Sequence, residues 1–179
     1  MKSFLRFATV AVPAAALGLA AWAGPAANPK LEMTVADRGK VTLELYAKEA
    51  PKTTAHIVDL CRKKFYDGIL IHRVEPGFVV QAGDPKTRTE GIDGPMIGSG
   101  GSGRNIPFEV NSRTHETGSL GMALSAPRSA TGDSQWFINL GPNHQLDGDY
   151  CVFGKVTKGM ALVKQIKRGD KIVSIRVLK

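Results

Sequence analysis

The apolar residues that follow position 30 alternate with polar ones, which is the pattern of strands with one buried face. Residues 31–35 and 40–45 both alternate in this way, and Asp37, Arg38 and Gly39 form a turn signal between them. The two segments therefore predict an antiparallel hairpin at the start of the fold.

Two later segments have the apolar spacing of helices. Residues 51–64 begin with Pro51, which suits the opening turn of a helix, and a second helix is predicted at about residues 160–166. Short strands lie between them, and residues 172–177 alternate as a closing strand. This order predicts a mostly antiparallel β structure with two helices, and periodicity does not decide between a closed barrel and an open sandwich.

Residues 71–84 join two short β-rich runs through a Pro-Gly turn and bring Arg73, Phe78 and Gln81 close together among apolar residues. A guanidinium stays charged at ordinary pH, so a partly buried one must be held by hydrogen bonds or await a ligand. The alternative is an ordinary strand with one arginine whose charged end reaches solvent.

Residues 132–140 show a second mixed pattern. At a period of two, Gln135, Phe137 and Asn139 share one face of a strand, while Trp136 and its alternate neighbours form an apolar face that predicts core. The first face combines amides with an exposed-side aromatic ring, which suits a wall that binds a peptide. A sandwich strand with an ordinary polar face is the alternative.

Together these segments closely resemble the cyclophilin family of peptidyl-prolyl cis-trans isomerases. Residues 71–84 match its Phe-His-Arg-Val-Ile-Pro-Gly-Phe-Met-Ile-Gln-Gly-Gly-Asp pattern, and residues 134–137 match its Ser-Gln-Phe-Phe. The Leu-Asp-Gly of residues 146–148, the Val-Phe-Gly-Lys-Val of residues 152–156 and the Ala-Pro-Lys-Thr of residues 50–53 also agree. The resemblance runs from about Leu31 to the C-terminus, so residues 31–179 are expected to form one isomerase domain.

The resemblance implies a closed eight-stranded antiparallel β-barrel capped by two α-helices. It also implies an enzyme that accelerates rotation about X-Pro bonds without a metal or other cofactor, with Arg73 as the catalytic residue. The substrate-binding residues carried over from the family pattern are Phe78, Val79, Gln81, Gly98, Ala123, Leu124, Ser125, Gln135, Phe137, Leu146 and Tyr150.

The resemblance also assigns roles within this set. Phe78, Val79, Phe137 and Leu146 are expected to line a proline pocket, and Gln81 is expected to hold Arg73 and contact the substrate backbone. Ala123, Leu124, Ser125 and Gln135 are expected to form the adjoining groove for residues before the proline, with Gly98 at its rim. His72 points to the other face by strand alternation, and we expect it to be structural.

Four positions depart from the best-known eukaryotic pattern. Val79 replaces a methionine, Leu124 an asparagine, Gln145 a tryptophan and Tyr150 a histidine. Tyr150 is similar to the residue found there in bacterial periplasmic members. These departures bear on inhibitor binding and substrate preference, because Arg73 and its predicted partners are retained.

The N-terminus has the pattern of a secretory signal peptide. Lys2 and Arg6 precede a mostly apolar run over residues 7–21, and Ala21-Trp22-Ala23 has small residues flanking a cleavage position before Gly24. A membrane anchor is the alternative, but the run is short for a span and contains Pro13. We expect cleavage of residues 1–23, a flexible lead-in over residues 24–30, a periplasmic location and no stable membrane insertion afterwards.

The charge of the chain is basic but scattered. The formal net charge is +8, and removal of Lys2 and Arg6 with the leader lowers it to +6. Because the basic residues do not gather in one stripe, a solvated surface is favoured over nucleic-acid binding. The expected partners are unfolded or partly folded polypeptides that contain proline, and a monomer is expected.

Other chemistries have little support. Cys61 and Cys151 could pair in an oxidising compartment, but nothing brings them together, and two buried thiols are favoured. Neither they nor the four histidines have metal-ligand spacing. The glycine-rich residues 98–103 lack the Gly-Lys-Ser/Thr ending of a nucleotide loop, which leaves the rim of a groove or a surface loop without a role.

Two functions from different classes remain open. One is an isomerase, and the other is a proline-peptide binding module or chaperone that uses the same groove without turnover. Retention of Arg73 favours the isomerase, because a pure binder has little use for a group that stabilises a transition state.

Overall fold

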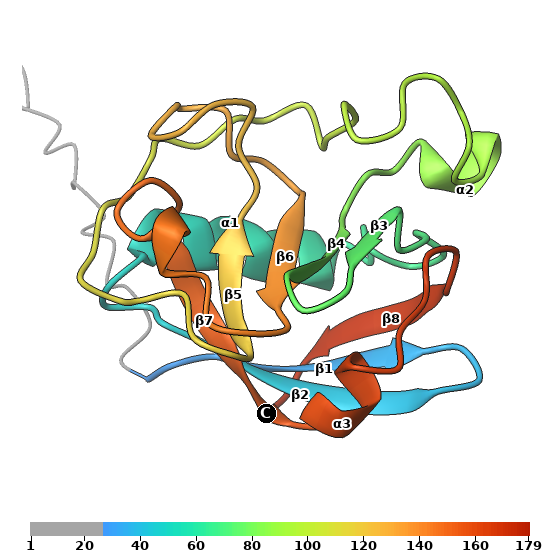
Figure 1. Ribbon diagram of the computed structural model, residues 1–179, viewed down its shortest axis with the longest axis horizontal. Coiled ribbons are helices and arrows are strands. Elements are labelled where there is room, and N and C mark those ends of the chain that lie inside the picture. Colours follow the sequence, from blue (N-terminus) through green and yellow to red (C-terminus); the bar gives the residue numbers. More distant parts are fainter. Residues whose placement is uncertain (1–26) are drawn as a thin grey trace, which may run out of the picture.

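The computed structural model describes residues 27–179, which fold around one eight-stranded antiparallel sheet (Figure 1). The strand order is β3-β4-β6-β5-β7-β2-β1-β8. The strands are β1 (Lys30–Val35), β2 (Gly39–Leu45), β3 (Arg73–Glu75), β4 (Val79–Ala82), β5 (Ser119–Met122), β6 (Trp136–Asn139), β7 (Val152–Lys158) and β8 (Ile172–Val177). The helices are α1 (Pro51–Arg62), α2 (Thr87–Glu90), a 3-10 turn (His144–Leu146) and α3 (Met160–Val163).

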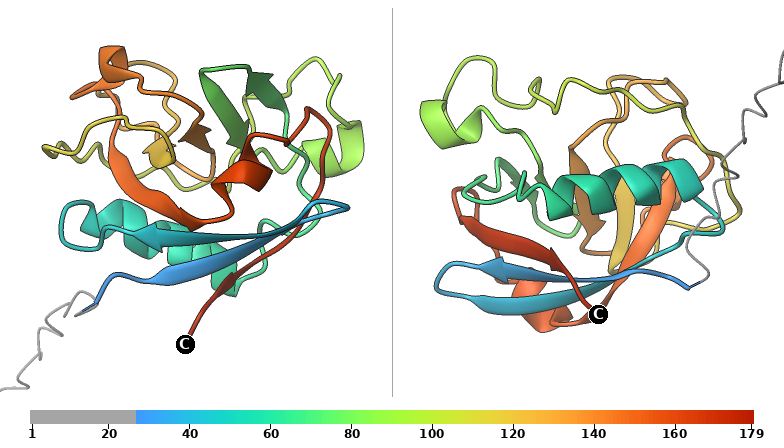
Figure 2. Two further views of the ribbon diagram at one scale, coloured as in Figure 1. Left: turned by 60° about the horizontal axis from the view of Figure 1, so that its bottom comes forward. Right: turned by 180° about the vertical axis from the view of Figure 1, so that it is seen from behind.

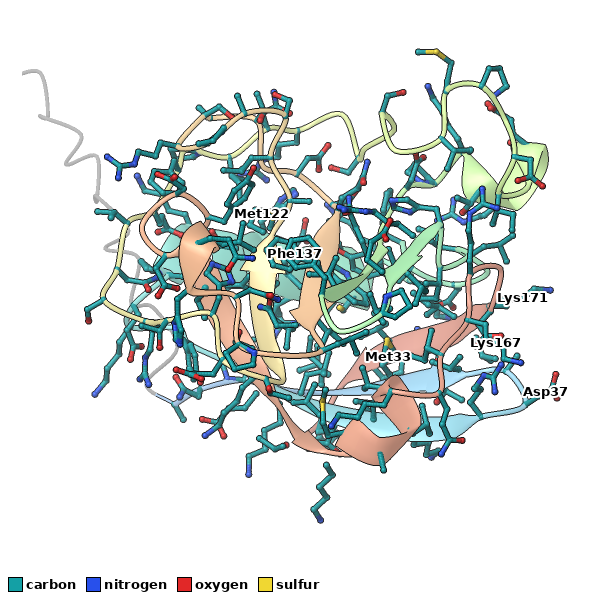
Figure 3. All side chains as sticks on the ribbon, in the orientation of Figure 1. Met33, Asp37, Met122, Phe137, Lys167 and Lys171 are labelled. Atoms are coloured by element: carbon teal, nitrogen blue, oxygen red, sulfur yellow. The ribbon has the colours of Figure 1, made fainter. Side chains whose placement is uncertain are left out.

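The predicted hairpin is confirmed. β1 and β2 pair from Lys30 opposite Glu44 to Val35 opposite Gly39, and their inward residues, such as Met33 in Figure 3, are buried. Asp37 and Gly39 in the connection both have positive φ, of 56° and 117°, conformations that aspartate tolerates and glycine adopts freely.

The first helix begins where the sequence predicts and ends two residues earlier. Pro51 occupies the first turn, and the carboxylate of Glu109 accepts hydrogen bonds from the backbone N–H groups of Lys52 and Thr53 at 2.9 and 2.7 Å. This distant carboxylate supplies the cap that Ala50 lacks and complements the helix dipole. The helix ends at Arg62, because Lys64 turns into the left-handed region at φ 57°.

The prediction of a closed barrel is wrong, because the sheet is curled but open. β3 and β8 form its two edges, and they are not paired strands. The gap is crossed by an isolated bridge between Leu70 and Lys171 and by backbone bonds such as Ile71 N–H to Asp170 O at 2.9 Å. β3 spans only three residues, because the chain turns at once into β4, and this leaves too short a ladder to close the sheet.

The helices also differ from the predicted pair of caps. α1 runs across the back of the sheet, as the right view of Figure 2 shows, and α3 is a single turn beside β2. α2 was not predicted because four residues are too few to show a period. It follows Asp84, whose carboxylate accepts the Lys86 N–H at 2.9 Å.

Both cysteines are buried and unpaired, as predicted. Burial raises the pKa of the Cys61 and Cys151 thiols to about 12, so neither is reactive at neutral pH.

Within residues 27–179, no helix combines the length and the apolar character needed to span a membrane.

The predicted leader lies outside the described residues, and the predicted lead-in falls partly within them. The side chain of Asn28 donates to Glu44 at 2.9 Å and accepts the Ala47 N–H at 3.2 Å, and the Pro29 carbonyl accepts the Leu45 N–H. The chain is therefore fixed to β2 and the segment after it from Asn28 onward, and the prediction of a flexible lead-in is wrong for residues 28–30.

Candidate active site

A hollow of about 270 Å³ lies where β3, β4 and β6 meet the 3-10 turn. Its lining contains eight of the residues predicted for the site: Arg73, Phe78, Val79, Gln81, Ala123, Phe137, Leu146 and Tyr150. These positions are far apart in the sequence, and the antiparallel register of the sheet brings them together.

The register puts the central residues of the site in one row. Arg73 pairs with Gln81 across β3 and β4, Gln81 pairs with Phe137 across β4 and β6, and Phe137 pairs with Gly121 across β6 and β5. Directly opposite residues on one face of a sheet are close neighbours. A cation, an amide and an aromatic ring therefore follow one another across three strands, and Phe137 is labelled over β5 and β6 in Figure 3.

A second hollow of about 610 Å³ continues from the first, because Gln81 and Ala123 line both. It contains the remaining predicted residues, Gly98, Leu124, Ser125 and Gln135. It also contains residues that the sequence did not single out, among them Lys86, Thr131 and Asp133. The two hollows together form one groove, with an apolar pocket at one end and a polar wall at the other.

A chain of hydrogen bonds runs along the groove from the arginine to the glycine-rich loop. Arg73 Nη1 donates to Gln81 Oε1 at 3.3 Å, and Gln81 Nε2 donates to Gln135 Oε1 at 3.1 Å. Gln135 Nε2 then donates to the carbonyl oxygens of Gly98 and Gly100 at 2.9 and 2.8 Å. Since every donor points the same way, the orientation of both amides is fixed.

Two buried carboxylates hold the backbone of residues 98–104. Asp84 accepts the N–H groups of Gly98 and Gly100 at 2.6 and 3.0 Å, and Asp133 accepts those of Gly103 and Arg104 at 3.0 and 3.3 Å. A Cβ atom at position 100 would lie 2.1 Å from Asp84 Oδ1, so glycine is required for this approach. Residues 98–104 therefore form a wall of the groove whose backbone is fixed by hydrogen bonds.

Arg73 is more exposed than the sequence indicated. Its side chain is 44% exposed, its Nε lies 3.6 Å from Glu75 Oε1, and its guanidinium lies 5.7 Å from the centre of the Phe78 ring. The guanidinium is at the mouth of the pocket because β3 is an edge strand with only β4 beside it. Contact with a ligand would therefore remove it from water.

Asn139 is not part of the predicted exposed face. β6 lies between β4 and β5, all four of its residues are buried, and Trp136 is core as predicted. The Asn139 amide donates to Ser119 and to His115 Nδ1, and its carbonyl oxygen accepts from Asn143 at 2.6 Å. This network supports the site from behind.

His115 is the element of that support that sequence reasoning missed. Its ring stacks on Phe137 at 5.6 Å between centroids, and its Nε2 lies 3.1 Å from the Tyr150 carbonyl oxygen. With Nδ1 accepting from Asn139, the ring is neutral with the proton on Nε2. No spacing in the sequence links residue 115 to residue 137, so the contact has no local signal.

Burial lowers the pKa of both His115 and His72. His72 does not line the smaller hollow but lines a neighbouring one with Arg73 and Gln81, and neither of its buried ring nitrogens has a hydrogen-bond partner. Both histidines are therefore held in the neutral form by the folded state.

The free energy of unfolding should consequently fall as the pH is lowered below about 6.5, where histidines of the unfolded chain begin to bind protons. The folded-state pKa values are the lower ones, so this stability is complete above that pH and is lost beneath it. Urea unfolding between about pH 7.5 and 5.5 measures the slope above the range in which carboxylates titrate. His72→Phe should reduce the slope, because phenylalanine fills the site without a buried base, and an unchanged slope would contradict the assignment to His72.

The position of Gln145 differs from that of its neighbour Leu146. Gln145 is exposed on the 3-10 turn and lines neither hollow, while Leu146 closes one side of the smaller hollow.

In residues 27–179, no group of three or more histidine, cysteine or acidic side chains is arranged to hold a metal ion.

Comparison with known proteins agrees with this architecture. Residues 30–178 match the family described as cyclophilin type peptidyl-prolyl cis-trans isomerase/CLD. The chain is 41% identical over 143 residues to peptidyl-prolyl cis-trans isomerase B of Bacillus subtilis, which covers 79% of this chain and 92% of that protein. It is 39% identical over 175 residues to a probable peptidyl-prolyl cis-trans isomerase of Brucella suis, which covers 94% of this chain and 88% of that one.

A solved structure is similar as well. The crystal structure of a Cryptosporidium parvum cyclophilin type peptidyl-prolyl cis-trans isomerase in the presence of the dipeptide Ala-Pro has a TM-score of 0.71 and 25% identity, and it covers 84% of this chain and 99% of that one. The family match spans nearly all of the described residues, including every residue of the groove. The chain therefore belongs to the cyclophilin-type peptidyl-prolyl cis-trans isomerase family.

Proposed function

We propose that this protein accelerates the rotation of X-Pro bonds in exported polypeptides, with Arg73 as the group that stabilises the transition state. Isomerase activity belongs to the family, and the proposal concerns the mechanism and the clients. One observation carries it: Arg73, Gln81 and Phe137 are adjacent in a row, so a charged donor borders the aromatic wall of a small hollow.

The chemistry requires a donor and no covalent partner. Rotation about a peptide bond has a barrier of about 18–20 kcal/mol that arises from amide resonance, and X-Pro bonds are those with both isomers populated. As the amide twists, the prolyl nitrogen regains its lone pair and becomes a better hydrogen-bond acceptor. An N–H of Arg73 that points at this nitrogen stabilises the twisted form more than either planar one.

The surroundings of Arg73 prepare it for this role. Gln81 holds one N–H of the guanidinium, and the ring of Phe78 lies beside it, which leaves other N–H groups for a substrate. A bound polypeptide would cover the exposed guanidinium, and removal from water strengthens a charge-assisted hydrogen bond. Together with positioning, a reduction of the barrier by about 7 kcal/mol would give roughly 10⁵-fold acceleration.

Residues before the proline would occupy the larger hollow. Gln135 presents its amide there, Ser125 is exposed at one side, and Lys86 lies at the other, with its Nζ 3.2 Å from Ser99 Oγ. The hollow thus offers both donors and acceptors to an extended backbone. The similarity to an isomerase studied with Ala-Pro supports proline-containing polypeptides as the partners.

A protease-coupled assay with a proline tetrapeptide tests this function against the alternative of a binding module. We expect catalysed cis-to-trans conversion at catalytic amounts of protein, since the donor acts only on the twisted amide. Saturable binding of the peptide without acceleration would instead support a binding module or chaperone.

Export to the periplasm is part of the proposal and rests on the leader pattern of residues 1–23. Tyr150, which is similar to the residue at this position in bacterial periplasmic members, agrees with it. The protein isolated from its host should begin at or near Gly24 and fractionate with soluble exported proteins. N-terminal sequencing measures this. A protein that retains Met1 and fractionates with the cytosol or with membranes would contradict it.

A further inference from the structure

A third hollow, separate from the proline pocket, lies along the outer side of α1. It has a volume of about 840 Å³ and is the largest of those described for residues 27–179. One wall is α1, and the other is the segment of residues 104–107. In the right view of Figure 2, no other helix or strand crosses in front of α1. We refer to this hollow as the α1 groove.

The α1 groove is lined by cations that lack counter-ions. Lys52, Arg62 and Arg104 are exposed, and among the described residues none of their side chains forms an ion pair. The one acidic residue of the lining, Asp59, is already paired with Lys63 at 2.7 Å. An anionic ligand would therefore meet three cations that form no ion pair, and the Glu109 carboxylate that caps α1 is the acid nearest to the Lys52 end.

The cations are spaced along the groove with apolar surface between them. Lys52 and Arg62 stand at opposite ends of α1, ten residues apart, which corresponds to about 15 Å along a helix. Ala55, Val58 and Ile106 line the stretch between them. An extended polypeptide advances about 3.3 Å per residue, so four to five residues cover this length, and the volume suits such a segment.

The composition of the chain's own N-terminal segment does not suit it as an anionic ligand for the α1 groove. Pro29 lies at one end of the α1 groove, so the preceding residues start close to it. Residues 1–29, however, contain no aspartate or glutamate, and their charged side chains are Lys2 and Arg6. Charge complementarity therefore favours an acidic segment of another polypeptide.

We propose that the α1 groove binds an extended acidic segment of a client polypeptide, with two carboxylate side chains about four residues apart and apolar residues between them. Residues four apart lie on the same side of an extended chain, which lets both carboxylates meet the cations at the two ends. This binding goes beyond proline recognition, because the client segment needs no proline to make these contacts.

The α1 groove joins the active-site groove at one residue. Asn105 lines both hollows, and between them His56 Nε2 lies 3.1 Å from the Asp133 carboxylate that holds residues 103 and 104. A client bound at both places would hold its proline near Arg73 at a raised local concentration. The α1 groove would in this way assist turnover of a client without taking part in the chemistry.

Fluorescence anisotropy with a labelled, proline-free peptide containing Glu-Leu-Val-Ala-Glu tests the proposal. We expect saturable binding that weakens as salt is added, because exposed charges are screened. Arg62→Glu and Arg104→Glu should each weaken binding by about tenfold or more. Lys164→Glu, an equal change of charge at an exposed residue outside the groove, should leave binding unchanged.

A peptide of the same composition with adjacent glutamates, Glu-Glu-Leu-Val-Ala, separates geometry from charge and should bind more weakly. Equal binding of the two peptides, or binding that survives both arginine substitutions in correctly folded variants, would overturn the proposal. So would a dimer in sedimentation that dissociates in Arg62→Glu and Arg104→Glu, because a second copy of the chain would then occupy the groove. Turnover of a short proline peptide should be unchanged in Arg62→Glu, so the outcome does not depend on the isomerase mechanism.

Discussion

Replacing Arg73 by alanine should lower kcat/KM for a proline tetrapeptide at least about a hundredfold, which is a loss of about 2.7 kcal/mol of transition-state stabilisation. The expected loss is large because the donor meets a better acceptor only in the twisted amide. The effect should appear mainly in kcat, since the apolar lining of Phe78, Phe137 and Leu146 still binds the proline.

The matched control is Arg73→Lys, which keeps the charge and removes the planar fork. Lysine would lose the contact with Gln81 and present a single, more strongly hydrated charge, so we expect it to recover only part of the activity. The thermal midpoint should change little in both variants, because the arginine side chain is 44% exposed. A folded Arg73→Ala protein with near-normal turnover would refute the assigned role.

Gly121→Ala should impair both stability and catalysis. A Cβ atom at position 121 would lie 2.1 Å from Cζ of Phe137, whose ring is held by stacking on His115 and is only 5% exposed. The ring cannot move without entering the pocket or disturbing its support. We expect a loss of about 1–3 kcal/mol in the free energy of unfolding, as for other overpacked cores, and a fall in kcat/KM of about tenfold or more.

Adding Phe137→Leu to Gly121→Ala distinguishes the collision from other effects of the new methyl group. The double variant should unfold at higher denaturant concentration than Gly121→Ala alone, because the smaller side chain leaves room. Its activity should not recover, since the aromatic floor of the pocket is gone. Strictly additive losses in stability would mean that the two positions do not collide.

Periodicity within short segments was sufficient to predict the hairpin, α1 and β8. The residues of the groove were carried over from the family resemblance, and those outside the matching motifs, such as Gly98 and Ala123, rest on it alone. Their adjacency depends on register, which a single sequence does not display. Only the structure shows that Arg73, Gln81, Phe137 and Gly121 are opposite one another.

The features that could not be predicted all depend on long-range contacts. The exposure of Arg73 follows from the edge position of β3, and the burial of Asn139 from the central position of β6. The clamps formed by Asp84 and Asp133 join single side chains to loop backbone 14 to 30 residues away, and no periodic pattern encodes such a bond. The prediction of a closed barrel came from the family resemblance, because periodicity alone did not decide between a barrel and a sandwich.

The open seam between β3 and β8 has a consequence for motion. Strands inside the sheet are held on both sides, but β3 is held only by β4, so it can open without unfolding the rest of the ladder. Its backbone amides should therefore exchange with deuterium sooner than those of β1 or β2. Arg73 is carried by a three-residue edge strand, and we expect small displacements of that strand to shift its guanidinium relative to Phe137 on the central strand β6.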